Sequence, residues 1–293
     1  MPLRKLNGSI QEPVIETFSL PNFTFIQTSS PTINAELGGG FVRGTVNGLY
    51  GLFGAGKSQW CEDVAVNVAL AHGSIALIDS DAACGHAPQA KLNMIQRLGG
   101  SVLSGDELRA KGILTGTDPV ELSRQYYAYL DSVLVGLGVV IYAPMSMEAL
   151  HETIAQVTTE TVYDLLVVDS LTLYYKDDVC ANRGQSNKEY GGQYLPVVAQ
   201  IMLLLDAYAK TGSTVIVTCQ RISEIGMEKQ AKLHKNEEYR EYVGSDIPGY
   251  HFKTIIELKK KNDTFAAFIH KNRGSPADPR RGIPFAAIPG GIA

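Results

Sequence analysis

Apolar residues occur along the chain in short continuous runs that are separated by longer segments of mixed polarity. Five of these runs predict β-strands, at 45–50, 74–78, 139–142, 165–168 and 214–218. The segments between them include helical patterns, for example over 146–158 and 195–208. Two later runs, 254–258 and 265–270, predict a C-terminal β-hairpin. Because continuous apolar runs are typical of strands buried on both faces, the expected fold class is α/β, with a mainly parallel twisted sheet flanked by helices.

The pattern predicts one core with short additions at either end. Residues 1–25 contain three prolines and little periodicity, so we expect an N-terminal arm there. The core is expected over 26–288, and a tail over 289–293. Within the core, the stretch of about 82–138 contains more helical material than the predicted sheet requires, and the sequence assigns no role to this enlargement.

Composition is typical of a cytoplasmic globular protein. Of the 293 residues, 45% are hydrophobic and 19% are charged, which is too apolar for a disordered chain. The longest weakly polar stretch, 132–145, is too short and too often interrupted by glycine to cross a bilayer, so no membrane partner is expected. The four cysteines are scattered and form no C-x-x-C pair, which predicts reduced thiols. Secreted, membrane-spanning and zinc-ribbon proteins are therefore excluded.

Charge is distributed unevenly along the chain. The formal net charge is −4, yet residues 221–281 carry 13 Lys and Arg against 9 Asp and Glu, a net of +4. A C-terminal third that faces a polyanion and an ordinary solvated surface both fit this distribution. Charge alone therefore leaves nucleic acid open as a partner.

A phosphate-binding motif follows the first predicted strand. Residues 51–58 fit G-x-x-x-x-G-K-[ST] at every fixed position, in the strand–loop–helix context that the motif requires. Lys57 would reach the β- and γ-phosphates, and the Ser58 hydroxyl would contact Mg²⁺. A glycine-rich turn with a chance Lys-Ser pair is the alternative. The residues expected to contact the nucleotide are Gly51, Gly54, Ala55, Gly56, Lys57, Ser58, Gln59 and Asp169.

Carboxylates follow two of the predicted strands. Asp169 closes the run at 165–168, where an aspartate in a P-loop enzyme would hold Mg²⁺ together with Ser58. Asp79 and Asp81 follow the strand at 74–78 and would face the same crevice. One of them is expected to orient or deprotonate the attacking water, with a helix N-cap as the alternative role.

Several segments resemble the same protein family, in the same order along the chain. The residues that carry the resemblance are 26–30, 37–45, 51–61, 168–172, 218–220 and 268–276. They resemble the RecA/RadA recombinases, most closely the archaeal RadB-type paralogues, with KaiC-like features near the C-terminal end. The resemblance covers about 26–288 and implies a RecA-type P-loop core that binds ATP and Mg²⁺ at a subunit interface.

The resemblance also implies roles for single residues. Lys57, Asp81 and Gln220 become the catalytic set, in which Gln220 senses the γ-phosphate. Asp81 stands where the recombinases have a glutamate, so it is one methylene shorter and hydrolysis is expected to be slow. Lys271 and Arg273 match basic residues that contact the ATP of a neighbouring subunit, although a solvated strand end is the alternative.

Single-stranded DNA is the expected macromolecular partner. The first DNA loop of the recombinases would contain Arg183 and the second would span 221–248, where an exposed helix with paired charges is the alternative. The expected DNA contacts are Arg183, Arg221, Lys229, Lys232 and Lys235. Only about 25 residues precede the core, and the segment around Phe18 lacks the alanine of the Phe-x-x-Ala polymerisation motif. These departures favour a paralogue that forms a homo-oligomer, or a hetero-oligomer with a RadA-type recombinase.

The leading hypothesis is therefore an ATP-binding and ATP-hydrolysing protein that binds single-stranded DNA in homologous recombination and DNA repair. A KaiC-like signalling ATPase with protein partners remains an alternative. A mediator that binds ATP without hydrolysing it, and that docks onto a true recombinase, is a third hypothesis.

Overall fold

The computed structural model describes residues 25–81, 87–174, 187–220, 247–273 and 276–293 of the chain. Apart from Phe25, the expected N-terminal arm lies outside these residues. Among the described residues, no helix has the length and apolar character needed to cross a membrane.

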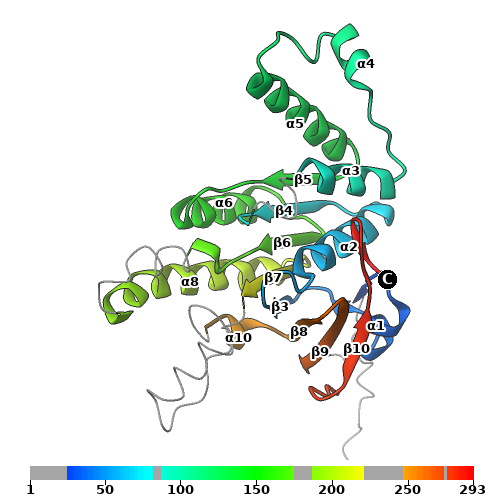
Figure 1. Cartoon of the computed structure of the whole chain (residues 1–293). Coiled ribbons are helices and arrows are strands. Elements are labelled where there is room, and N and C mark those ends of the chain that lie inside the picture. The colour runs from blue at the N-terminus through cyan, green and yellow to red at the C-terminus, as the bar shows by residue number, and fades with distance from the viewer. Residues whose placement is uncertain (1–24, 82–86, 175–186, 221–246, 274–275) are drawn as a thin grey trace, which may run out of the picture.

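An eight-stranded sheet forms the centre of the molecule, with the strand order β10-β9-β8-β3-β7-β6-β4-β5 (Figure 1). The six strands from β8 to β5 are parallel, whereas β9 and β10 are antiparallel to their neighbours. Their bounds are β3 Val46–Gly51, β4 Ile75–Asp79, β5 Val139–Tyr142, β6 Leu165–Asp169, β7 Thr214–Gln220, β8 Thr254–Lys261, β9 Thr264–Lys271 and β10 Gly282–Phe285. The predicted α/β class and mainly parallel sheet are thus confirmed.

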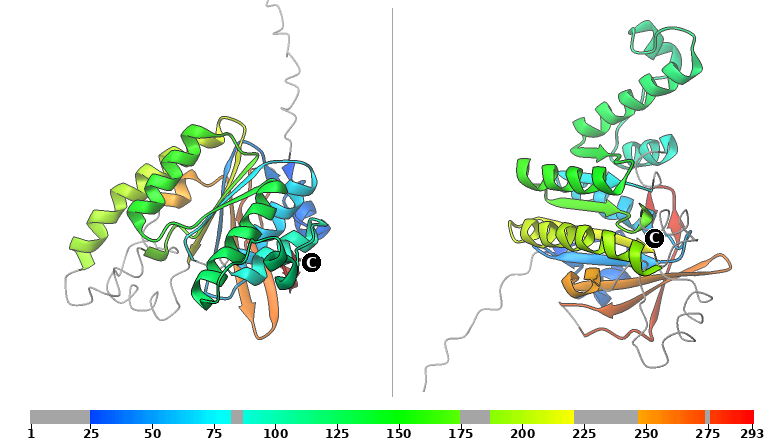
Figure 2. Two further views of the ribbon diagram at one scale, coloured as in Figure 1. Left: turned by 90° about the horizontal axis from the view of Figure 1, so that it is seen from above. Right: turned by 90° about the vertical axis from the view of Figure 1, so that its left-hand side faces the viewer.

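Helices cover both faces of the sheet (Figure 2). The first face carries α1 Pro31–Glu36, α2 Lys57–Leu70, α3 Pro88–Arg97 and part of α5 Pro119–Gly136. The second carries α6 Met147–Glu160, α8 Asn187–Ala209 and α10 Ile247–His251. Alternate residues of one strand serve the two cores: in β4, Ile75 and Leu77 pack on the first face and Ala76 and Ile78 on the second. This two-sided burial is the reason why the central strands read as continuous apolar runs.

The helical enlargement projects beyond the β5 edge of the sheet (Figure 1). It contains α3, the short helix α4 Gly105–Ala110 and α5, whose C-terminal half buries Leu130 and Leu134 completely. Local signals set the helix starts: Ser104 and Glu107 form a capping box at α4, and the Asp118 side chain caps α5. The N-terminal half of α5 extends past the sheet and leaves Val120 77% exposed.

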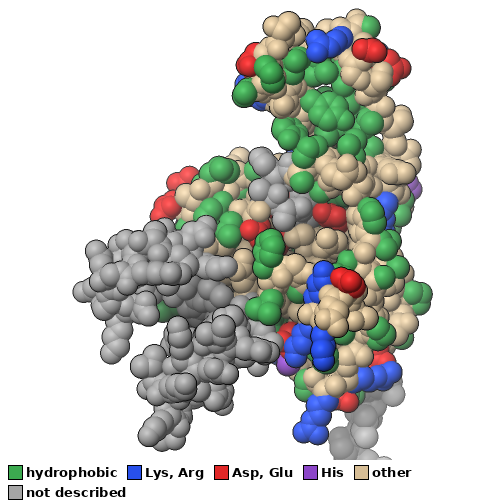
Figure 3. Space-filling view, viewed as in Figure 1, with side chains coloured by type: hydrophobic (Ala, Val, Ile, Leu, Met, Phe, Trp, Pro, Cys, Tyr) green, Lys and Arg blue, Asp and Glu red, His purple; other side chains and the backbone are tan. Residues whose placement is uncertain are grey.

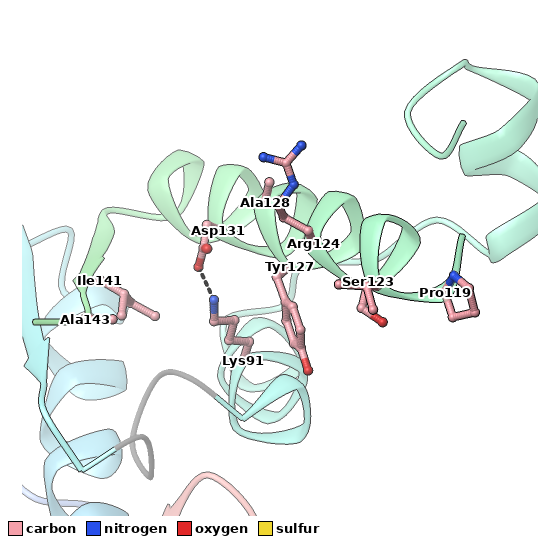
Figure 4. A pocket seen from close by; sticks show the side chains of 10 residues that line it. Lys91, Pro119, Ser123, Arg124, Tyr127, Ala128, Asp131, Ile141 and Ala143 are labelled. Atoms are coloured by element: carbon pink, nitrogen blue, oxygen red, sulfur yellow. Dashed lines mark hydrogen bonds and ion pairs between the residues drawn. The ribbon is translucent and has the colours of Figure 1, made fainter. Parts of the chain in front are cut away.

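A cavity of about 690 Å³ lies beneath the projecting half of α5 (Figure 4). At its floor, Lys91 of α3 is buried and pairs with Asp131 of α5, 2.5 Å away. Its walls are mostly apolar side chains of α5 and β5, among them Tyr127 and Ile141. None of the residues that line this cavity belongs to the expected nucleotide site.

Short strands that the sequence did not predict complete the molecule. β1 Phe25–Ile26 pairs with β2 Phe41–Val42, and β11 Ala287–Ile288 pairs with β12 Gly291–Ile292. Although we expected a tail at 289–293, Ile292 within it is fully buried in the first core. Its backbone N–H lies 3.4 Å from a carboxylate oxygen of Asp63 on α2, so this segment packs against the helix that follows the phosphate loop.

Candidate nucleotide-binding site

The candidate site lies along the carboxyl ends of four neighbouring parallel strands. In the sheet these strands stand in the order β3, β7, β6 and β4. The register pairs Gly51 at the end of β3 with Gln220 at the end of β7, and Asp79 at the end of β4 with Asp169 at the end of β6. The phosphate loop, the glutamine and the carboxylates therefore share one edge of the sheet, where open α/β sheets bind ligands.

Glycines shape the phosphate loop as the motif requires. Gly54 and Gly56 have φ values of 74° and 93°, in the left-handed region that favours glycine. A Cβ on Gly51 would lie 2.5 Å from the carbonyl oxygen of Leu258 on β8, so a side chain there would collide with the backbone. Ala55 is buried behind the loop, whereas Gln59 is partly exposed. The loop thus has the backbone that a phosphate cradle needs.

The helix after the loop is ready to receive an anion. α2 begins at Lys57 with Gly56 as its N-cap, and Gly56 makes no side-chain capping bond. The N–H groups of a helix N-terminus and the positive end of the helix dipole together favour a bound phosphate. Lys57 is 8% exposed, and its ammonium donates to the carbonyl oxygens of Gly51 and Leu52, both at 3.1 Å. These contacts hold the lysine side chain folded back over its own loop.

A buried carboxylate lies beside the loop, at the end of β6. Asp169 is 1% exposed; the Ser58 hydroxyl donates to its Oδ2 at 2.7 Å, and the Thr218 hydroxyl donates to its Oδ1. Burial raises the pKa of Asp169, while the hydrogen bonds from Thr218 and Ser58 oppose that rise. A hydroxyl and a carboxylate are hard oxygen donors of the kind that Mg²⁺ prefers. The residues present therefore fit the ion that the motif implies.

The other expected catalytic residues lie close to this pair. Asp81 follows β4, and its backbone N–H donates to the carbonyl oxygen of Asp169 at 3.3 Å. Burial lowers the pKa of Lys57, and the carboxylates of Asp169 and Asp81 both oppose this shift. Gln220 is 6% exposed, and its backbone N–H donates to the Thr172 hydroxyl at 2.9 Å. Lys57, Asp81, Asp169 and Gln220 are thus brought together around one edge of the sheet.

One acidic residue near this site, Glu62, was not predicted from the sequence. Glu62 lies one turn after Ser58 on α2 and is 5% exposed. Burial, followed by the charges of Asp169 and Asp79, raises the pKa of Glu62 to about 8. Its spacing of four residues from Ser58 places it on the same face of the helix, which is the only sequence signal that could have identified it.

Lys271 and Arg273 lie away from the phosphate loop of their own chain. Lys271 ends β9, which is antiparallel to β8, and it pairs with Ile255 near the start of β8. Gly48, three residues before the end of β3, stands in the same row. Both basic residues are exposed. Partial burial lowers the pKa of Lys271, and the positive charge of the nearby Lys253 lowers it further. Lys271 therefore lies three residues before the row of Gly51, and the chain continues from it toward the amino end of β3, away from the nucleotide edge.

The expected DNA contacts fall on segments that the structure does not describe. Arg183, Arg221, Lys229, Lys232 and Lys235 all lie outside the described residues. Their roles therefore stay predictions from the sequence.

Comparisons with known proteins agree with this geometry. No protein-family model matches the chain. The DNA repair protein RAD51 of Mycosarcoma maydis is 26% identical over 273 residues, which are 91% of this chain and 69% of that protein. The DNA repair and recombination protein RadA of Halobacterium salinarum is 30% identical over 155 residues, which are 50% of this chain and 44% of that protein. The chain thus spans between about half and two thirds of the length of these relatives.

A solved structure shares the fold over most of the chain. The crystal structure of the RadB recombinase matches with a TM-score of 0.56 at 19% sequence identity, over 92% of this chain and 98% of that one. The relatives and the shared fold support a RecA/RadA-superfamily protein that is similar to RadB. They confirm the resemblance to recombinases that the motifs predicted, and they give no support to the KaiC-like alternative. Recombinases of this superfamily are ATPases, which agrees at the level of the family with a nucleotide site at the phosphate loop.

Proposed function

We propose that the chain is a Mg²⁺-dependent ATPase that binds single-stranded DNA and acts in homologous recombination and DNA repair. The observation that carries the proposal is the contact of Ser58 with Asp169, which joins the phosphate-loop helix to the end of β6. Two relatives named for DNA repair and recombination support the biological setting. A shared RadB-like fold over nearly the whole chain supports the same assignment.

Each residue at the nucleotide edge has a task in this proposal. The N–H groups of the loop and of the α2 N-terminus bind the phosphates, and the Lys57 ammonium moves from its own carbonyl contacts to the β- and γ-phosphate oxygens. Asp81 accepts a proton from, or orients, the water that attacks the γ-phosphorus in line. Gln220 lies between the loop and Asp169, where its amide can sense whether the γ-phosphate is present. Mg²⁺ bound by Ser58 and Asp169 would neutralise charge on the β- and γ-phosphates.

Oligomerisation is part of the proposal because the basic pair lies at the wrong end of the sheet for its own nucleotide. Lys271 and Arg273 would reach an ATP only when a second subunit presents its phosphate loop to them. The phosphate loop exposes two large apolar side chains that such a contact would bury, since Phe53 is 87% and Leu52 is 47% exposed. A cation delivered across the interface would stabilise the charge of the transferred phosphoryl group.

A basic surface supports the DNA component of the proposal. Lys and Arg side chains gather over the C-terminal strands on the face shown in Figure 3. Lys259, Lys260 and Lys261 are all exposed at the end of β8, and Lys260 lies 5.1 Å from the centroid of the Phe265 ring. Basic side chains next to aromatic rings are typical of surfaces that bind a single strand through its backbone and bases. Binding of this kind is sensitive to salt and poor in sequence readout.

ATP hydrolysis with and without single-stranded DNA tests the function directly. We expect slow hydrolysis that single-stranded DNA stimulates. Because counterion release drives such binding, the affinity for single strands should fall by about 10³-fold between 50 and 200 mM salt if six or more phosphates are contacted, and the stimulation should decline with it. Lys57→Ala should abolish both rates. Lys210→Ala is the matched control, because Lys210 follows the last residue of α8, is 74% exposed and pairs with Asp206. Equal rates in the wild type and Lys57→Ala, or no binding to single strands at low salt, would overturn the proposal.

A further inference from the structure

Ser80 lies between Asp79, the last residue of β4, and Asp81, and it makes several contacts with the end of β6. Its hydroxyl accepts the N–H of Ser170 at 2.8 Å and donates to the carbonyl oxygen of the same residue at 2.6 Å. Its own backbone N–H donates to the carbonyl oxygen of Asp169 at 2.7 Å. Ser80 is 7% exposed and Ser170 is fully buried. Through these hydrogen bonds Ser80, the residue before Asp81, is attached to Asp169 and Ser170 at the end of β6.

A second hydroxyl makes the corresponding contact on the other side of β6. Thr172 is 4% exposed, and its Oγ1 accepts the backbone N–H of Gln220 at 2.9 Å. Next to it, the N–H of Leu171 donates to the carbonyl oxygen of Thr218 at 3.0 Å. Residues 169–172 are therefore held by β4 through Ser80 and by β7 through Thr172.

These contacts begin where the regular sheet ends. The β4–β6 ladder ends with the pair Asp79 and Asp169, and the β6–β7 ladder ends with Val168 and Val217. Beyond those pairs, parallel strands have no ladder hydrogen bonds to keep them together. The side-chain hydroxyls and neighbouring backbone contacts continue the connection for two or three residues, up to Asp81 on one side and Gln220 on the other.

We propose that Ser80 and Thr172 are positioning residues that clamp residues 169–172 and so fix Asp81 and Gln220 relative to Asp169. The inference rests on the proposed ATPase function and specifies how its site is regulated. Loss of the γ-phosphate at Gln220 changes the position of residues 169–172 through Thr172, and Ser80 carries that change to Asp81. A displacement of about 1 Å at such a site lowers the rate by about 10²-fold.

Valine and serine at position 172 separate the clamp from simple packing. Thr172→Val keeps the shape of the side chain and removes the acceptor for the Gln220 N–H, whereas Thr172→Ser keeps the hydroxyl. We expect Thr172→Val to bind Mg-ATP within about threefold of the wild type while kcat falls by about tenfold or more. Thr172→Ser should recover most of that loss. The ratio of single-strand affinities in ATP and in ADP should move toward one in Thr172→Val only.

Two further variants keep the test decisive. Thr45→Val is the matched control, because the hydroxyl of Thr45 is equally buried and donates to the Val42 carbonyl at 2.6 Å, just before β3 at its amino end. Thr45→Val should lower the thermal midpoint without changing kcat. Ser80→Ala removes the clamp from the β4 side, so it should show the same split between affinity and kcat, and it decides the matter if Thr172→Val does not fold.

The outcomes distinguish the inference from the function on which it rests. A wild-type chain without ATPase activity would overturn the proposed function, and the clamp with it. An active wild type with an unchanged kcat and ATP/ADP ratio in Thr172→Val and Ser80→Ala would overturn the clamp alone. The clamp is also wrong if Thr172→Ser loses as much activity as Thr172→Val.

Discussion

The Ser58 hydroxyl donates a 2.7 Å hydrogen bond to Oδ2 of the buried Asp169, so the first turn of α2 contacts the end of β6 directly. These two side chains are 111 residues apart in the chain. Both can act as oxygen ligands, and a cation placed between them would take the place of this hydrogen bond.

Removing the Ser58 hydroxyl should weaken nucleotide binding only when Mg²⁺ is present. We expect Ser58→Ala to raise the Kd for Mg-ATP by about tenfold or more, on the scale seen when groups around a metal are removed. The Kd for ATP in EDTA should change little. Calorimetric titration measures both, and Ser58→Thr, which keeps the hydroxyl, is the control. Equal losses with and without Mg²⁺ would show that the hydroxyl has no part in metal binding.

Lengthening Asp81 by one methylene should speed the chemical step. The carboxylate lies close enough to Lys57 to oppose the effect of burial on the lysine pKa. We expect Asp81→Glu to raise the single-turnover rate of ATP hydrolysis and Asp81→Asn to lower it by about 10²-fold or more, the usual range for general acid–base catalysis. A rate in Asp81→Glu no higher than in the parent would mean that side-chain length does not limit hydrolysis.

Asp63 should contribute strongly to stability because it joins three parts of the chain. This fully buried carboxylate on α2 accepts the N–H of Ser29 at 2.7 Å and pairs with Arg97 of α3 at 3.0 Å. Removing one partner of a buried ion pair costs about 3–5 kcal/mol. We therefore expect Asp63→Ala to lower the free energy of unfolding by about that amount in urea titrations.

The pair of the partly exposed Asp206 on α8 with the exposed Lys210, which follows that helix, provides the contrast. Asp206→Ala should cost only about 0–1 kcal/mol, as for other surface pairs. Equal losses in Asp63→Ala and Asp206→Ala would contradict the role that we assign to Asp63 as a buried link.

Glu62 should make stability fall as the pH rises. Its pKa is raised from 4.5 to about 8 in the folded state, so the folded chain binds an extra proton between those two values. Stability must then decrease with pH across this window, from about 4.5 to about 8. Glu62→Gln cannot ionise, and without nucleotide or Mg²⁺ it should gain stability relative to the wild type between pH 5 and pH 8.5. The same replacement at the exposed Glu160 should leave the urea midpoints unchanged, and parallel profiles for Glu62→Gln and the wild type would refute the prediction.

Much of the site could be predicted because its motifs are local. The phosphate loop needs a fixed set of residues over eight positions, and Asp169 follows an apolar run that only a buried strand explains. Since the carboxyl ends of parallel strands meet at one edge, the order of the motifs predicts that Asp81, Asp169 and Gln220 lie near the loop. The structure places all of them there.

The hydroxyl contacts could not be predicted from the same patterns. Ser80 and Ser170 are 90 residues apart, and Thr172 and Gln220 are 48 apart, so their meeting depends on strand register. An isolated serine or threonine at a strand end does not reveal which neighbour it will contact.

Strand limits at the C-terminal end also differ from expectation. The hairpin strands extend to Lys261 and start again at Thr264, because exposed lysines continue a strand without continuing its apolar pattern. β10 was not predicted, since Gly282 and Pro284 both weaken a strand pattern in sequence. α8 begins at Asn187, eight residues earlier than expected, and contains Pro196 within it.

Titration of the chain with ATP in the presence of Mg²⁺ tests the central claim most directly. The account predicts saturable binding with one site per chain, and a loss of at least about tenfold in affinity in Lys57→Ala, because the ammonium supplies the charge that the phosphates require. Lys210→Ala, far from the site, should bind as the wild type does. Absence of binding by the wild type, or equal affinity in Lys57→Ala, would contradict the assignment of the phosphate loop as a nucleotide site.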